Sequence, residues 1–260
     1  MIISKLLPKF NSSFFKPKFK SSKPLLSTVE LDKKILSITT SSSINYLIGP
    51  LVGFTDAFWI SKLGNSLQVA GQGYADNIYN LLFSVFYFFS YFITPEVAQL
   101  NNPNQNDQDQ MINLISITVI LSFIMGVVVT LISNLLVIPI SESYIKNPQI
   151  SLFSQKYLRI RSLSFPFSMF NCSVFAVMRG MFLFKKAFLL NFYAQITNMI
   201  GNPIFMKLIG IEGIAMVSVF SEIICSCLYC YFLIKNHYFR LTVKNIFQNI
   251  QRIGNIGILI

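Results

Sequence analysis

The chain has 260 residues, of which 53% are hydrophobic and only 12% are charged. A soluble domain normally carries about a quarter charged residues, so this composition indicates a protein that folds in lipid. Lys and Arg number 21 against 10 Asp and Glu, and the basic excess flanks the apolar body at both ends. A basic nucleic-acid-binding patch within the body is therefore excluded.

Residues 1–30 form a basic, Ser-rich segment in which no acidic residue precedes Glu30. This composition is typical of a mitochondrial or plastid targeting segment. The competing interpretation is a basic cytosolic tail that fixes the membrane topology, because Lys and Arg accumulate on the cytoplasmic side. Both interpretations stay open.

The apolar body contains six stretches long enough to cross a bilayer core of about 30 Å, which needs about 20 residues per helix. We expect an all-α, multi-pass membrane protein with one six-helix domain over residues 31–235. Residues 236–260 are expected to form a basic linker and the start of a seventh helix near Ile253. The six predicted helices lie near 35–60, 75–95, 112–138, 157–178, 187–207 and 211–234.

The breaks between these helices are short and polar, as in NNPNQNDQDQ at 101–110 and at Lys185–Lys186, and leave no room for a soluble domain. No nucleophile with a His partner, no metal cluster and no phosphate-binding Gly loop is evident. We therefore predict no enzyme, no catalytic or metal-binding residues and no cofactor. The four cysteines are expected to be packing residues, since a lone CxxC lacks a second pair; they are Cys172, Cys225, Cys227 and Cys230.

One acidic residue, Asp56, lies within the first predicted helix, about two turns after Gly49 and Pro50. A carboxylate at mid-membrane costs about 2.5–3.5 kcal/mol on insertion scales, so such a residue usually faces a cavity or a partner. We interpret Asp56 as an ion-coupling group. The alternative is a hydrated, structural carboxylate near the outer end of the helix.

Polar residues also mark the fifth and sixth predicted helices. Gln195, Asn198 and Asn202 are spaced by three and four residues, which places three amides on one helix face. Glu222 follows Ser218 by four residues in the next helix. Such groups hold helices together or, where the face lines a cavity, contact a cation or a substrate.

Six segments occur in the order and spacing of one transporter family. They are GFTDAFWISKLGNSLQVAGQG at 53–73, ITPEVAQL at 93–100, YLRIRSLSFP at 157–166, VMRGMF at 177–182, TNMIGNPIF at 197–205 and GIEGIAMVSVFSE at 210–222. The series resembles multidrug and toxin extrusion (MATE) transporters over residues 31–235. The Tyr-Leu-Arg-Ile-Arg element and the Arg-Gly pair are closest to the DinF-like branch.

The resemblance implies an antiporter that expels organic cations, drugs or other small metabolites in exchange for H⁺ or Na⁺. Asp56 matches the family's first-helix carboxylate, the proposed ion site. Asn198 matches its fifth-helix asparagine, Asn202 its second carboxylate and Ser218 the polar residue of helix six. Gln195 occupies a further position that is usually polar, and we include Glu222 among the cavity residues.

The chain departs from the family pattern at three points. Asn202 replaces an aspartate, which leaves one carboxylate where two are usual, and Ser41 stands near the position of a kink-forming proline. The chain also matches only the N-terminal six-helix lobe, so we expect a homodimer, a second lobe on another chain, or a truncated gene model or degenerate product. The alternatives are a truncated or inactive assembly partner, and a lipid flippase.

Overall fold

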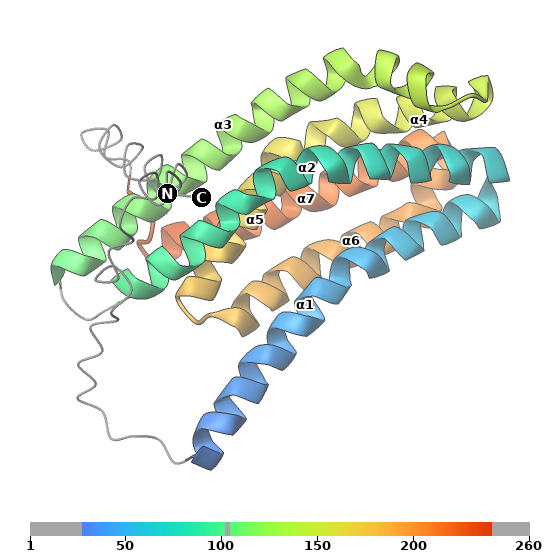
Figure 1. The fold of residues 1–260 in the computed structure, drawn as a ribbon. Helices are drawn as coiled ribbons and strands as arrows, with labels where there is room; N and C mark the ends of the chain where they lie inside the picture. The colour runs from blue at the N-terminus through green and yellow to red at the C-terminus, as the bar shows by residue number, and fades with distance from the viewer. Residues whose placement is uncertain (1–27, 102–104, 241–260) are drawn as a thin grey trace, which may run out of the picture. The chain divides into compact units, whose positions relative to one another are not determined.

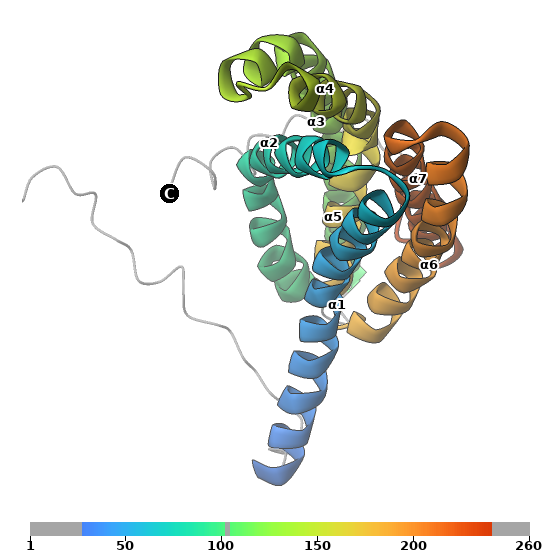
Figure 2. The ribbon, with the colours of Figure 1, turned by 90° about the vertical axis from the view of Figure 1, so that its right-hand side faces the viewer.

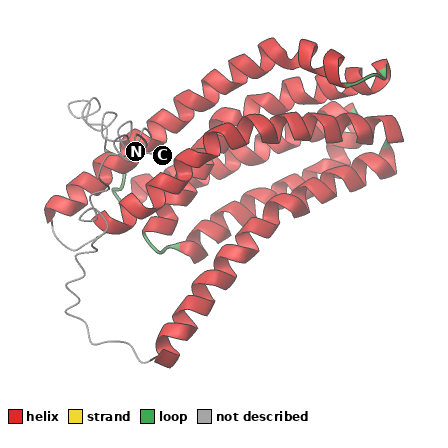
Figure 3. Cartoon of the chain, in the orientation of Figure 1, coloured by secondary structure: helices red, strands yellow, loops and turns green. Residues whose placement is uncertain are grey.

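The computed structural model describes residues 28–101 and 105–240. The chain divides into two units, Met1–Thr39 and Thr40–Ile260, and the first is described only as the opening of helix α1. Every regular element in these ranges is a helix (Figure 3). The elements are α1 (Thr28–Leu63), α2 (Ser66–Leu100), α3 (Gln105–Tyr144), α4 (Pro148–Arg161), the 3₁₀ turn η3 (Ser162–Ser164), α5 (Phe165–Gly180), α6 (Phe184–Ile209) and α7 (Ile211–Lys235).

Residues 1–27 and 241–260 lie outside the described residues, and with them most of the predicted N-terminal segment and the predicted start of a seventh helix. The described helices are longer than the predicted stretches, since polar and charged residues continue them beyond the apolar cores. Asn65 begins α2 one residue after Gly64, because its side chain accepts a 2.9 Å hydrogen bond from the Gln68 N–H as part of a capping box.

The predicted helix at 157–178 contains the 3₁₀ turn η3 between α4 and α5, and the backbone at Arg161, Ser162, Ser164 and Phe165 keeps right-handed helical dihedral angles. Pro166 stands in the first turn of α5 and has no backbone N–H, so a regular helix cannot pass through it unbroken. Two serines of η3, Ser162 and Ser164, hydrogen-bond the carbonyls of Arg159 and Arg161 three residues back at 2.8 Å each. The break therefore has its own polar support.

Helix α3 closes over this break. Thr130 Oγ1 donates to the Ser162 carbonyl at 3.0 Å, and Asn134 Nδ2 donates to Ser162 Oγ at 3.0 Å. Gly126 permits the close approach, since a Cβ at that position would lie 2.4 Å from Pro166 Cα. The polar groups freed by the break are thus satisfied inside the protein, as an apolar surrounding requires.

Within the second unit, α6 packs along α7, α2 packs against α4 and α5, and α3 packs against α5 (Figures 1 and 2). Two clusters of buried apolar side chains fill the contacts. The first contains Val97, Ile115, Val174, Val177 and Met178 of α2, α3 and α5. The second contains Ile60, Tyr79, Tyr157, Phe165 and Ile214, drawn from α1, α2, α4, α5 and α7.

Large apolar side chains also line outer faces of the helices. On α1 they recur at helical spacing, and Phe54 is 69% exposed; on α3 Leu135 is 78% exposed. A soluble monomer rarely leaves such surfaces open, whereas lipid solvates them. By length and mean hydropathy, two segments of the described chain are apolar enough to cross a membrane, Gln108–Ser143 with a value of 2.7 and Ile211–Lys235 with 1.9.

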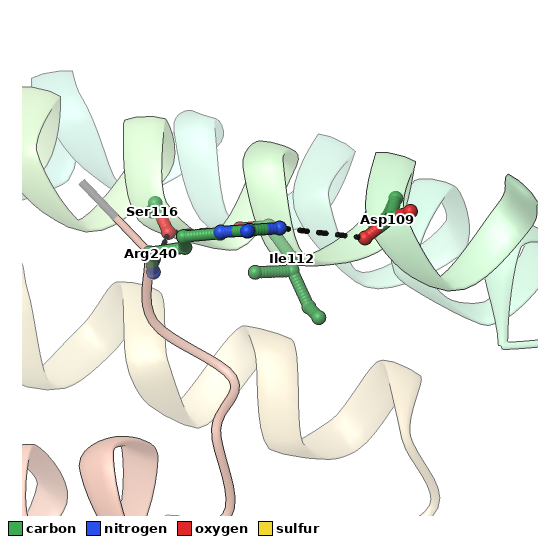
Figure 4. Close-up of polar contacts among 4 residues, drawn as sticks. All are labelled: Asp109, Ile112, Ser116 and Arg240. Atoms are coloured by element: carbon green, nitrogen blue, oxygen red, sulfur yellow. Dashed lines mark hydrogen bonds and ion pairs between the residues drawn. The ribbon is translucent and has the colours of Figure 1, made fainter. Parts of the chain in front are cut away.

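The segment after α7 crosses to α3 (Figure 4). The backbone N–H of Arg240 donates to Ser116 Oγ at 2.9 Å, and Ser116 Oγ donates to the Ile112 carbonyl at 2.9 Å. The Arg240 Nη1 atom lies 3.9 Å from Asp109 Oδ1. Both charged side chains are mostly exposed, so we assign the attachment chiefly to the hydrogen bond.

Candidate functional site

Asp56 of α1 and Asn202 of α6 are in direct contact inside the second unit. Asn202 Nδ2 donates a 2.6 Å hydrogen bond to Asp56 Oδ1. The Asp56 residue is 4% exposed and Asn202 is fully buried. A carboxylate withdrawn from solvent in this way needs hydrogen-bond donors, and the amide supplies one of them.

The contact continues into α7 through a chain of polar side chains. Asn202 Nδ2 also donates to Asn198 Oδ1 at 2.9 Å, and Asn198 Nδ2 donates to Ser218 Oγ at 3.2 Å. The four-residue spacing of the two asparagines on α6 aligns their amides. Asp56, Asn202, Asn198 and Ser218 thus connect three helices, and we call them the Asp56 chain.

One acceptor in this chain lacks a partner within the described residues. Asn202 Oδ1 is buried and accepts no hydrogen bond, although it belongs to the amide that binds Asp56. Carboxylate and amide oxygens are the ligand types that hard cations prefer. The chain can therefore present both oxygen types to a proton or a small cation.

The other two predicted cavity residues lie outside the Asp56 chain. Gln195 is half-buried, and its Nε2 atom is 3.5 Å from Asn191 Oδ1. Glu222 Oε2 accepts a 2.7 Å hydrogen bond from Asn171 Nδ2 of α5. Ser226 Oγ donates to Asn171 Oδ1 at 2.8 Å, which completes a separate α5–α7 cluster.

Sequence patterns miss a set of charged and aromatic side chains on α2 and α4. Arg161 resembles the basic residues of the outer loops, but its guanidinium Cζ lies 4.4 Å from the Tyr79 ring centroid. Its Nη1 donates to Ser164 Oγ at 3.1 Å. Asp76 lies one turn before Tyr79 on α2, within the predicted second helix. Its charge within an apolar helix is the sequence signal by which it could have been identified as a site residue.

Tyr157 belongs to the same region. Its ring and hydroxyl are fully buried, and the hydroxyl has no hydrogen-bond partner within the described residues. Its side chain interacts electrostatically with Asp76 and Asp56 and lies near Gln72. A buried phenol beside two carboxylates can donate to either of them after a small movement.

The cysteines and other candidate metal ligands form no site in the described part of the chain. No group of three or more His, Cys, Asp or Glu side chains is placed to hold a metal ion there. Cys225 is buried and Cys172 half-buried, as expected for packing residues. Cys227 and Cys230 are exposed, which corrects the prediction that they pack in the interior.

The helices, their exposed apolar faces and their buried polar chain define a polytopic membrane protein. The MatE family model matches residues 42–204, more than half of the chain. The chain therefore belongs to the MatE family, whose members are integral membrane transporters rather than enzymes. The predicted fold class and the prediction that the chain is not an enzyme are confirmed.

Solved structures agree on the fold. A MOP superfamily transporter from Pyrococcus furiosus, described as having a binding pocket of reversed polarity, has a TM-score of 0.74 at 20% identity, over 85% of this chain and 51% of its own. A MATE structure in the bent conformation has the same score and identity, over 86% and 51%. An outward-facing multidrug resistance MATE transporter has a TM-score of 0.73 at 20% identity, over 82% and 48%.

The chain thus spans about half the length of these solved transporters. No curated protein matches it by sequence. Assignment to the DinF-like branch, and the roles of individual residues, stay predictions.

Proposed function

We propose that this chain contributes to secondary active efflux, in which H⁺ or Na⁺ is exchanged for an organic cation, a drug or another small metabolite. Membership of the MatE family supports the transporter class. The observation that carries the proposal is the buried hydrogen bond between Asp56 and Asn202. A carboxylate inside a membrane protein usually marks an ion path, and this one is tied to a second helix.

In this proposal Asp56 binds the coupling ion, and the hydrogen bond from the Asn202 amide to Asp56 changes when the ion binds. A proton or cation on Asp56 competes for the oxygen that accepts the Asn202 amide, so binding favours a second arrangement of α1 relative to α6. A difference in ion affinity between two arrangements is what allows an ion to shift their populations. Asn198 and Ser218 hold Asn202 in position through the 2.9 Å and 3.2 Å hydrogen bonds.

Helix α1 has a point at which it can change shape. Pro50 lies within the helix, two turns before Asp56, and removes a backbone hydrogen bond there. Helix kinks concentrate at such positions. A Cβ placed on Gly49 or Gly53, on either side of the proline, would have no neighbouring atom within 4 Å, so the backbone there is not held by packing.

This chain spans about half the length of the solved relatives. We therefore place the translocation path between this lobe and a second one, whichever chain supplies it. Gln195 and Glu222 are proposed to line the path beyond the Asp56 chain. Small molecules entering from the lipid or the aqueous phase would meet this face.

The test is ion-driven transport of ethidium, an organic cation, by the full chain reconstituted in vesicles under an H⁺ or Na⁺ gradient. We expect Asp56→Asn to abolish gradient-driven flux. Asp109→Asn is the matched control, since Asp109 is an exposed carboxylate on α3 and its removal should leave flux unchanged. Full activity of Asp56→Asn would refute the proposal, and no flux by the wild-type chain would refute transport by paired copies of this chain alone.

A further inference from the structure

Arg161 is a charged residue to which the proposed function gives no role. It ends α4 at the helix break, with its guanidinium against the Tyr79 ring at 4.4 Å. In the described ranges, its side chain makes one hydrogen bond, to Ser164 Oγ, and no ion pair. Arg is always charged and offers five N–H donors, so most of its donor capacity is unused.

Carboxylates from three helices act on this charge. Ile60 of α1, one turn after Asp56, and Tyr79 of α2, one turn after Asp76, pack with Tyr157 of α4 in the second core cluster. Asp56 of α1, Asp76 of α2 and Glu222 of α7 all interact electrostatically with the Arg161 guanidinium. Two of them have amide donors, Asn202 at 2.6 Å for Asp56 and Asn171 at 2.7 Å for Glu222.

Asp76, the third carboxylate, lies near Gln72 and near the buried Tyr157, whose side chains can donate to it. Tyr157 precedes Arg161 by one turn of α4. Helices α2 and α4 pack against each other, and Tyr79, one turn after Asp76 on α2, has its ring centroid 4.4 Å from the Arg161 guanidinium. The neighbouring phenols, Tyr79 and Tyr157, are the other titratable groups that face Arg161.

Charges withdrawn from water act on one another more strongly than exposed ones, and in this region Asp56 is buried while Asp76 and Arg161 are half-buried. Unit charges a few ångströms apart in a protein interior change a binding constant by about an order of magnitude or more. A fixed cation that acts on Asp56 therefore weakens the binding of any mobile cation to it. A second carboxylate beside the fixed cation offsets part of that effect.

We propose, building on the coupling role of Asp56, that Arg161 is a tethered competing cation and Asp76 its balancing carboxylate, and that this pair sets the cation affinity of Asp56. Asp76 thus supplies the second carboxylate that Asn202 does not, from α2 instead of α6. Arg161 and Asp76 are positioning residues, since both act through the Asp56 oxygen atoms.

Trp59, the single tryptophan of the chain, reports on Asp56 without a transport assay. It follows Asp56 by three residues on α1 and packs partly buried against the second core cluster. Its fluorescence is recorded for the full chain in lipid nanodiscs during separate titrations with sodium chloride and with acid. The half-saturating cation concentration is the quantity compared between variants.

Arg161→Gln should lower the half-saturating concentration about tenfold, and Asp76→Asn should raise it about tenfold. Arg161→Lys keeps the charge and should stay close to the wild-type value. Arg159→Gln removes an exposed charge from the same helix and should change it little. A purely structural role of the pair predicts that both neutralising variants weaken binding, so the opposite signs are diagnostic.

Unchanged or weaker cation binding by folded Arg161→Gln would overturn this inference. Unchanged cation binding by Asp76→Asn would overturn it as well. If Arg161→Gln does not fold, the Asp76→Asn variant alone tests the inference. Asp56→Asn separates the two proposals. Loss of the fluorescence response in Asp56→Asn, with no shift in the other variants, leaves the proposed coupling site standing and removes the role of Arg161. An equal response of wild-type and Asp56→Asn rejects the coupling site itself.

Discussion

Asn202 Nδ2 donates to two acceptors at once, Asp56 Oδ1 at 2.6 Å and Asn198 Oδ1 at 2.9 Å. Both hydrogens of one amide are therefore committed, one to a neighbouring helix and one to its own. This arrangement makes Asn202 the connection between α1 and the α6–α7 pair. An aspartate at the same position would have no hydrogens to offer unless it were protonated.

Replacing Asn202 by alanine is expected to destabilise the protein by about 1–3 kcal/mol, because the buried Asp56 carboxylate and the Asn198 carbonyl oxygen lose their donor. The measurement is thermal or denaturant unfolding in detergent. Gln195→Ala, on the same helix, removes a half-buried amide with one long contact of 3.5 Å. It should change the stability by less than about 0.5 kcal/mol; equal effects would contradict the importance of the Asp56 chain.

Replacing Asn202 by aspartate should instead strengthen cation binding. The substitution places a second carboxylate within hydrogen-bonding distance of Asp56, and two such groups favour a shared proton or cation. We expect the half-saturating sodium concentration in the Trp59 titration to fall about tenfold. Gln195→Glu adds the same charge outside the Asp56 chain and serves as the control, with a smaller expected shift. Weaker binding by Asn202→Asp would count against a cation on Asp56.

Several features of the fold and site follow from local patterns. Asp56, Asn198 and Asn202 are predictable because an isolated acid and regularly spaced amides stand out within apolar helices, and the structure brings them together with Ser218. Arg161 could not be predicted in the same way. It follows a charged, amphipathic stretch of α4, and only the packing of α2 on α4 shows that it faces Tyr79.

Other features depend on contacts between distant parts of the chain. Glu222 resembles a cavity residue because it shares a helix with Ser218, yet its partner Asn171 lies 51 positions away. The division of the predicted 157–178 helix has a local cause in Pro166, but its tolerance depends on Thr130 and Gly126 of α3. Hydropathy alone does not show which helices meet.

The contact between α3 and the helix break yields a stability prediction. A Cβ on Gly126 would lie 2.4 Å from Pro166 Cα and 2.7 Å from the Phe165 carbonyl oxygen, which are backbone atoms that cannot rotate away. Gly126→Ala should therefore cost about 1–3 kcal/mol in unfolding free energy. Gly73→Ala is the control, since no atom lies within 4 Å of its Cβ position and alanine favours a helix by up to about 1 kcal/mol. Equal changes in the two variants would refute the close approach.

The Asn171–Glu222 contact allows stability to be separated from ion binding. Asn171→Ala leaves the Glu222 carboxylate without the donor that binds it at 2.7 Å, and should destabilise the protein by about 1–3 kcal/mol. Glu222→Gln keeps an oxygen that can accept from Asn171 and removes the charge, so its cost should be below about 1 kcal/mol. Because the Glu222 carboxylate is outside the Asp56 chain, Asn171→Ala should unfold more easily while the folded fraction keeps its Trp59 response to sodium. Loss of that response in folded Asn171→Ala would instead place Glu222 within the coupling site.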